Sequence, residues 1–114
     1  ILRFDAQLGT YKAHLKSGQQ DHPCYRCIFP EVPPADTTPS CAEAGVLGAL
    51  CGVVGSLQAT EILKEITGAG ISMSGSLLII DGLGCEFRKI KINSDPDCPL
   101  CGVQPKITNL SLHA

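Results

Sequence analysis

The chain has 114 residues, enough for one modest domain, with a formal net charge of −2 and a pI near 5.8. Charges of both signs are scattered, so the basic stripe typical of nucleic-acid binders is missing, and we expect no nucleic-acid partner. The uncharged stretch 44–60 carries four glycines and three polar residues. We therefore expect a buried helix there and no membrane contact.

The first 21 residues are predicted to form strands. Residues 2–8 alternate apolar and polar side chains, and residues 10–16 alternate again, which is the period of a half-buried strand. The pattern leaves open whether these runs form a hairpin at Gly9 or one long bent strand. The predicted inward-facing residues are Leu2, Phe4, Ala6, Leu8, Tyr11, Ala13 and Leu15.

Residues 22–40 combine a Cys-x-x-Cys pair with a loop. The segment 30–40, "PEVPPADTTPS", holds four prolines without periodicity, so it is predicted to be an extended crossover loop. His22 precedes the cysteine pair and His14 lies in the second alternating run. Neither histidine has an evident partner, and we expect both at the surface.

Residues 41–67 give the clearest helix signal. Ser40 and Glu43 have the spacing of a capping box, and Gly68 suits the end of the helix. The second half, "LQATEILKEIT", is amphipathic, with Ile62, Leu63 and Ile66 predicted to face inward, and Cys51 is predicted to pack in the core. A stripe of small residues along the helix predicts a close backbone or subunit contact; it comprises Gly45, Gly48, Gly52, Gly55 and Ala59.

The C-terminal part is predicted to hold strands over residues 74–92. "SLLIID" is a buried strand, "DGLG" is a turn, and "EFRKIKI" is an edge strand that Cys85 opens in a structural role. A second Cys-x-x-Cys pair follows in residues 93–105, and residues 106–114 form an indeterminate tail.

The two cysteine pairs, Cys24/Cys27 and Cys98/Cys101, suggest one tetrahedral zinc site. Four thiolates satisfy a zinc ion, and a two-residue spacer lets both sulfurs of a pair face inward. A redox pair and unligated thiols are the alternatives, although prolines follow the first pair where a thioredoxin-like motif would open a helix. No signal-peptide pattern is visible, which favours a reducing, cytoplasmic setting.

Cys41 is a candidate nucleophile, because it is predicted at the start of the long helix. A helix N-terminus stabilises a thiolate. The alternative is that Cys41 is only a small residue that fills the helix start.

Four segments together resemble the ThiF/MoeB/HesA family, relatives of the ubiquitin-activating enzymes, and are most similar to its MoeB-type molybdopterin-synthase adenylyltransferases. They are "PCYRCIFPE", "PSCAEAGVLGALCGVVGSLQATEILK", "GSLLIIDGLGCEFRKIKI" and "DPDCPLCG". The resemblance implies an α/β chain that is the C-terminal part of a Rossmann-like activating-enzyme fold, with mixed or antiparallel strands around one long Gly-rich helix and a four-cysteine zinc site.

The resemblance also implies a function. Such enzymes bind ATP and magnesium, adenylate the C-terminal glycine of a small ubiquitin-fold sulfur carrier for thiocarboxylation in molybdenum-cofactor biosynthesis, and are usually homodimers. By resemblance, Cys24, Cys27, Cys98 and Cys101 match the zinc ligands, and Cys41 matches a position that carries a sulfur intermediate in some members.

The family's nucleotide-binding residues are not visible in this chain. We therefore expect residues 1–114 to be the C-terminal half of such an enzyme, inactive alone, with ATP and magnesium bound elsewhere in the parent. Whether a rhodanese domain follows stays open. The alternative functions are activation of a thiamine sulfur carrier or of a ubiquitin-like modifier for tRNA thiolation, and a non-catalytic zinc-stabilised interaction module.

Overall fold

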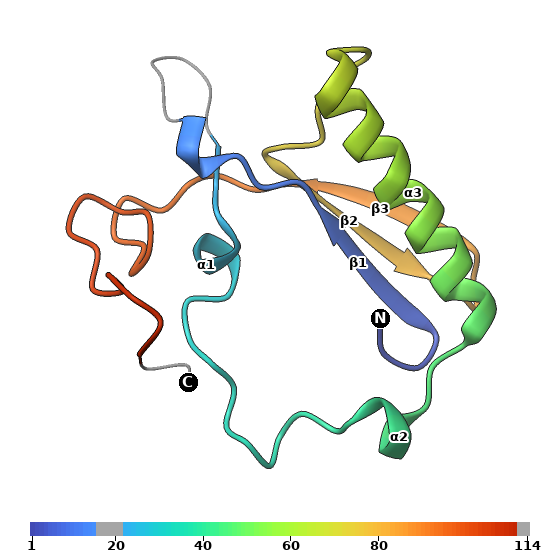
Figure 1. Cartoon of the computed structure of the whole chain (residues 1–114). Helices are drawn as coiled ribbons and strands as arrows, with labels where there is room; N and C mark the ends of the chain where they lie inside the picture. The colour runs from blue at the N-terminus through green and yellow to red at the C-terminus, as the bar shows by residue number, and fades with distance from the viewer. Residues whose placement is uncertain (16–21, 112–114) are drawn as a thin grey trace.

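A three-stranded antiparallel sheet and one long helix form the folded centre of the computed structural model (Figure 1), which describes residues 1–15 and 22–111. The strands lie in the order β1-β2-β3. The mixed α/β character predicted from the sequence is confirmed. In chain order the elements are β1 (Asp5–Gly9), the 3₁₀ helix η1 (Ala13–Leu15), α1 (Tyr25–Ile28), α2 (Cys41–Ala44), α3 (Gly48–Thr67), β2 (Ser76–Asp81) and β3 (Glu86–Lys91).

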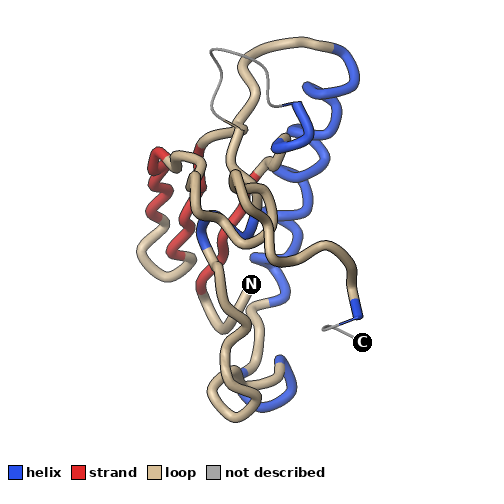
Figure 2. Tube along the Cα trace, turned by 90° about the vertical axis from the view of Figure 1, so that its left-hand side faces the viewer, coloured by secondary structure: helices blue, strands red, loops and turns tan. Residues whose placement is uncertain are grey.

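The core lies between the sheet and α3. On β1, Ala6 pairs with Ile80 of β2, and both are buried against Leu50 and Val54 of α3. Leu78 packs against this cluster at its edge. Figure 2 shows the strands and α3 as neighbouring layers. Figure 1 places α1 and the C-terminal loops together on the side of the molecule opposite α3.

A tight turn joins β2 to β3 and also holds the N-terminal segment. The Asp81 carboxylate accepts hydrogen bonds from the backbone N–H groups of Leu83 and Gly84, which is the pattern of an Asx turn. Gly82 donates its N–H to the carbonyl of Phe4 at 2.8 Å. A Cβ at position 82 would lie 2.6 Å from that same oxygen, so only glycine allows this approach.

The predicted helix 41–67 is interrupted, and this corrects the expectation of one continuous helix. Ser40 and Glu43 do form the predicted capping box, but the short helix α2 ends at Gly45, whose φ of +80° and ψ of 162° are not helical. The Arg3 N–H donates to the Gly45 carbonyl, and the Arg3 carbonyl accepts from the N–H of Leu47. These long-range hydrogen bonds keep the segment between α2 and α3 out of the helical conformation. The helix α3 then ends at Gly68, as predicted.

The buried face of α3 differs from the predicted one. The predicted inward residues Ile62, Leu63 and Ile66 are 59%, 61% and 75% exposed, and Cys51 is also exposed. The inward stripe instead follows helical spacing from the core toward the C-terminal end of the helix. It consists of the buried residues Leu50 and Val54 and the half-buried residues Leu57, Glu61 and Lys64.

The stripe of small residues does not lie under a backbone contact among the described residues. A Cβ added at Gly48, Gly52 or Gly55 would meet no atom of the described chain within 4 Å. The predicted close contact within the chain is therefore wrong for these glycines, while a contact with another subunit stays a prediction.

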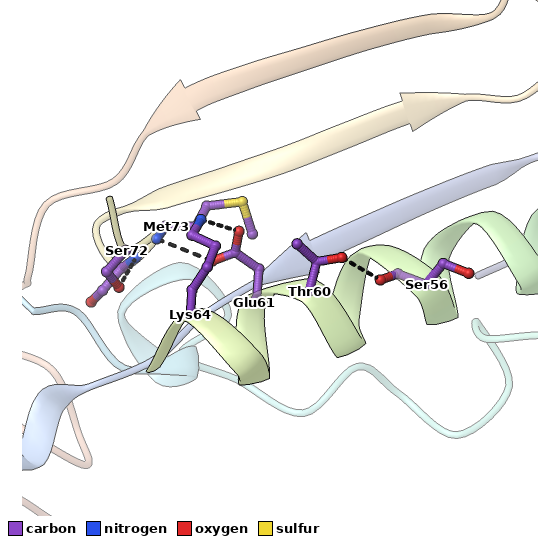
Figure 3. Close-up of polar contacts among 7 residues, drawn as sticks. Ser56, Thr60, Glu61, Lys64, Ser72 and Met73 are labelled. Carbon is purple, nitrogen blue, oxygen red and sulfur yellow. Dashed lines mark hydrogen bonds and ion pairs between the residues drawn. The ribbon is translucent and has the colours of Figure 1, made fainter. Parts of the chain in front are cut away.

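The polar end of the inward stripe fastens α3 to the segment before β2. Figure 3 shows Glu61 and Lys64 directed toward Met73. The Glu61 carboxylate pairs with Lys64 and accepts the backbone N–H of Met73 at 3.3 Å. One turn further along, Glu65 pairs with Lys12 at 2.7 Å. The helix end is thus tied to segments on both sides of it in the sequence.

The second predicted N-terminal strand is not formed in the part of the chain that the structure describes. Residues 10–12 are irregular, and residues 13–15 form the 3₁₀ helix η1. The part of that prediction on residues 16–21 lies outside the described residues. In the first run, Ala6 and Leu8 are buried as predicted, whereas Leu2 and Phe4 are 38% and 44% exposed. Leu2 and Asp5 close a turn instead of extending the strand.

Within residues 1–15 and 22–111, no helix combines the length and apolar character needed to cross a bilayer.

Candidate metal centre

The four cysteines of the two Cys-x-x-Cys pairs meet in one cluster, although the pairs are far apart in the sequence. The sulfurs of Cys24, Cys27, Cys98 and Cys101 all lie within 4.8 Å of one another. Across the two pairs, the Cys24 and Cys98 sulfurs are 3.6 Å apart and the Cys27 and Cys101 sulfurs 3.4 Å apart. Four thiols in this arrangement could hold a metal ion.

The first pair is shaped by a single turn of helix. Cys24 is the N-cap of α1, and its carbonyl accepts the N–H of Cys27 at 3.1 Å. The preceding residue, Pro23, is fully buried. The N–H of Asp95 reaches across from the second pair's loop and donates to the Cys27 sulfur at 3.4 Å.

The second pair depends on a glycine that sequence reasoning missed. The N–H of Cys101 points to the Cys98 sulfur at 3.5 Å, and the N–H of Gly102 donates to the Cys98 carbonyl at 3.0 Å. A Cβ at position 102 would lie 2.5 Å from the carbonyl oxygens of both Cys98 and Pro96. The available signal was the glycine directly after the second cysteine of "CPLCG".

The cluster fits a tetrahedral ion of zinc size. Sulfurs about 2.3 Å from a central zinc are separated by about 3.8 Å along each edge of a regular tetrahedron. Three of the six sulfur–sulfur separations are 3.4, 3.6 and 3.9 Å, close to that edge, and all six are within 4.8 Å. Cys24 and Cys98 are buried, and Cys27 and Cys101 are half-buried, so the ion would be largely shielded from water.

The thiol pKa values also fit a cation. Burial raises the pKa of Cys101, and hydrogen bonds with the sulfurs of Cys24, Cys27 and Cys98 raise it further, to about 12. At Cys98, burial acts in the same direction, but the backbone N–H groups of Cys101 and Leu100 outweigh it and lower the pKa to about 7. Without a metal, the cluster cannot ionise all its thiols near neutral pH. A divalent ion removes that conflict by stabilising every thiolate.

His22 lies outside this cluster. It was expected at the surface, but it is 9% exposed, and its Nδ1 lies 2.9 Å from the Ser74 hydroxyl, ahead of β2. The expectation that it sits at the surface is wrong, and its contact with Ser74 links the segment before the first cysteine pair to the segment before β2. His14 is exposed, as expected.

The other three cysteines are exposed. Cys41 is the first residue of α2, which has only four residues, so it does not sit at the start of a long helix as predicted. Cys51 lies on α3, and its exposure contradicts the predicted core position. Cys85 has a left-handed backbone, with φ of +53°, in the turn before β3. None of the three belongs to the four-sulfur cluster.

An open groove of about 940 Å³ lies between the N-terminal segment and the Pro-rich loop. Arg3 and Gln7 line one side, and Phe29, Pro33 and Thr38 line the other. Thr38, the last of the lining residues along the sequence, precedes Cys41 by three residues.

Comparisons with known proteins agree on one family. A model described as the ThiF family matches residues 1–100. Over 110 residues the chain is 50% identical to the adenylyltransferase and sulfurtransferase MOCS3 of Mus musculus and 51% identical to that of Bos taurus, covering 96% of the chain and 23% of each relative. Over 105 residues it is 47% identical to the sulfur carrier protein adenylyltransferase of Thermus thermophilus, covering 92% of the chain and 38% of that relative. The chain thus spans less than two fifths of the length of these curated relatives.

Proposed function

The chain belongs to the ThiF family, and from this we propose that it is the zinc-bearing part of an ATP-dependent adenylyltransferase. Its substrate is the C-terminal glycine of a ubiquitin-fold sulfur-carrier protein. The observation that carries the proposal is near-50% identity to proteins named as adenylyltransferases, over almost the whole chain. ATP and magnesium are bound by residues of the parent enzyme outside this chain.

Zinc in this proposal is structural. Cys24, Cys27, Cys98 and Cys101 hold the ion, and it links two loops that are 74 residues apart. The four thiolates leave no open coordination position for water or substrate, which distinguishes a structural site from a catalytic one. The site's contribution to function is to fix the Pro-rich loop and the groove beside it.

The groove is the proposed path of the carrier's C-terminal tail. An extended tail that ends in glycine is narrow, and it fits between the N-terminal segment and the Pro-rich loop. Phe29 and Pro33 provide apolar wall, while Arg3 and Gln7 provide polar groups on the opposite side. A tail that follows the groove to Thr38 brings its carboxyl end toward Cys41.

Cys41 is the proposed transfer nucleophile, and Cys51 and Cys85 are not. Its sulfur attacks the carbonyl carbon of the carrier's acyl adenylate, the bond from that carbon to the AMP oxygen breaks, and a thioester with Cys41 forms as AMP leaves. The support is its exposed position and its place three residues after Thr38, which lines the groove. Because α2 has only four residues, the dipole of a long helix adds nothing to this argument.

We further propose a molybdopterin-synthase sulfur carrier as the substrate, a homodimer as the active form, and a cytoplasmic location. The motif resemblance to MoeB-type enzymes supports these three points. Carriers for thiamine synthesis and modifiers for tRNA thiolation share the same ubiquitin fold and glycine end, so they are the competing substrates in any assay.

ATP–pyrophosphate exchange by the full-length protein tests the function. We expect exchange that depends on one carrier and that disappears when the carrier lacks its terminal glycine. In the Cys41→Ala variant, adenylation should remain while thiocarboxylate formation slows, and Cys51→Ala should behave as the wild type. Absence of exchange with every carrier would favour a non-catalytic interaction module. An unchanged thiocarboxylate rate in Cys41→Ala would return Cys41 to a packing role.

A further inference from the structure

The four cysteines of the cluster differ in their exposure to solvent. Cys98 is 0% exposed and Cys24 is 7% exposed, whereas Cys27 and Cys101 are half-buried. Each cysteine pair therefore contributes one buried and one half-buried residue. The two half-buried cysteines belong to different pairs, and their sulfurs are only 3.4 Å apart.

We infer that this asymmetry makes the cluster sensitive to oxidants. When a peroxide oxidises the thiolates that hold the metal, Cys27 and Cys101 form a disulfide with each other. The inference rests on the proposed metal site. Oxidation of a thiolate requires contact with the oxidant, so the two half-buried cysteines react before the two buried ones. The sulfur nearest to Cys27 is then that of Cys101 at 3.4 Å, ahead of Cys24 at 3.9 Å.

The chemistry balances with a peroxide as the only co-reactant. The thiolate of one accessible cysteine attacks a peroxide oxygen, the O–O bond breaks, and a sulfenic acid and hydroxide form. The thiolate of the other cysteine attacks the sulfenic sulfur and expels a second hydroxide as the S–S bond forms. Two thiolates lose two electrons, the peroxide gains them, and two protons from solvent complete two waters.

The product keeps the connection that the metal made. A disulfide needs the two sulfurs about 2.05 Å apart, so they move by a little more than 1 Å from their 3.4 Å separation. Residues 27 and 101 stay linked, and Cys24 and Cys98 remain buried 3.6 Å apart as the dithiol. Binding drops from four thiolates to two, which releases the metal, and a thiol reductant restores the site.

The experiment uses the zinc-loaded full-length protein with Cys41, Cys51 and Cys85 replaced by serine, because these exposed thiols would otherwise react first. Zinc is measured before oxidation, then hydrogen peroxide is added while free zinc is followed with a chromogenic chelator. Disulfides are mapped by mass spectrometry after digestion without reductant. We expect loss of the bound zinc with a dominant Cys27–Cys101 disulfide, and recovery of zinc binding after reduction.

The controls separate the two claims. Zinc absent before oxidation would contradict the proposed metal site, and the disulfide map of the same sample would still test the inference. A dominant Cys24–Cys27 or Cys98–Cys101 disulfide, or zinc retained while Cys27 and Cys101 stay reduced, would overturn it. A metal-free sample oxidised in parallel shows whether the pairing preference belongs to the protein's geometry, and we expect the same Cys27–Cys101 product there.

Discussion

Gly102 is the residue on which the second cysteine loop depends most directly. Any β-carbon there would meet two carbonyl oxygens and a backbone nitrogen at 2.5–2.7 Å, and backbone atoms cannot turn away as a side chain can. The Cys98 carbonyl involved in this contact belongs to a proposed ligand. A larger residue at position 102 would therefore displace the backbone of Cys98 and disturb the metal centre.

Gly102→Ala should lower both zinc affinity and the melting temperature, because the loop must shift to admit a methyl group. The matched control is Gly55→Ala on α3, where a β-carbon meets nothing within 4 Å among the described residues. There alanine should be neutral or stabilising, by up to about 1 kcal/mol. Competition with a zinc chelator and thermal unfolding measure both effects. Equal behaviour of the two variants would refute the steric argument.

At the residue scale, spacing predicted which four cysteines meet, because a two-residue spacer restricts the geometry within each pair. Burial of the other residues was not predictable in the same way. Cys51 was expected in the core and is exposed, while His22 was expected at the surface and is buried. The burial of each residue depends on which distant segment of the chain packs against it, and the sequence pattern around the residue does not contain that information.

Among the elements, the capping box of α2 has a measurable effect on the pKa of Glu43. The Ser40 backbone N–H and hydroxyl lower the pKa of the Glu43 carboxyl below its usual value of 4.5. Because the pKa of Glu43 is lower in the folded protein, its hydrogen bonds with Ser40 stabilise α2 at pH values above 4.5. This stabilisation is lost as the pH falls through the lowered pKa of the folded protein.

Ser40→Ala should raise the pKa of Glu43, since the hydroxyl contribution disappears while the backbone contribution stays. A carboxyl-carbon NMR titration measures the shift. Ser40→Thr keeps a hydroxyl and should leave the pKa near the wild-type value. If the pKa of Glu43 were the same in all three proteins, the Ser40 hydroxyl would not be stabilising the Glu43 carboxylate.

The inward stripe of α3 predicts unequal costs for two similar substitutions. Leu50 is 5% exposed in the core cluster, and Leu63 is 61% exposed on the other face. Leu50→Ala should lower the free energy of unfolding by about 2–5 kcal/mol, because it removes buried methyl groups and leaves a cavity. Leu63→Ala should cost clearly less, and denaturant unfolding compares them. A larger loss for Leu63 would mean that the outer face of α3 is the buried one.

At the element scale, helix ends were easier to predict than helix continuity. Ser40, Glu43 and Gly68 act through neighbours in the sequence, and all three occupy the expected capping positions. The break at Gly45 depends on hydrogen bonds from Arg3, more than forty residues earlier. The inward face of α3 likewise follows the position of β1, so the apolar run "EILKEI" alone pointed to the wrong side.

Across the whole molecule, the cysteine cluster joins two loops that the sheet and α3 do not hold together. The sheet core lies against α3, whereas α1 and the C-terminal loops lie on the other side (Figure 1). A metal link between residues 74 apart restricts the unfolded chain strongly. Metal removal by a chelator should therefore lower the melting temperature and increase proteolysis in residues 22–40 and 93–105. Unchanged cleavage there after complete metal loss would contradict this role.

The central claim is that both cysteine pairs form one metal centre, and zinc stoichiometry tests it most directly. Native mass spectrometry of the reduced, purified protein should give one zinc per chain. Replacing Cys98 with serine should abolish binding, while replacing the exposed Cys85 with serine should leave one zinc in place. No zinc in the reduced wild-type protein, or one zinc retained by the Cys98→Ser variant, would contradict the account.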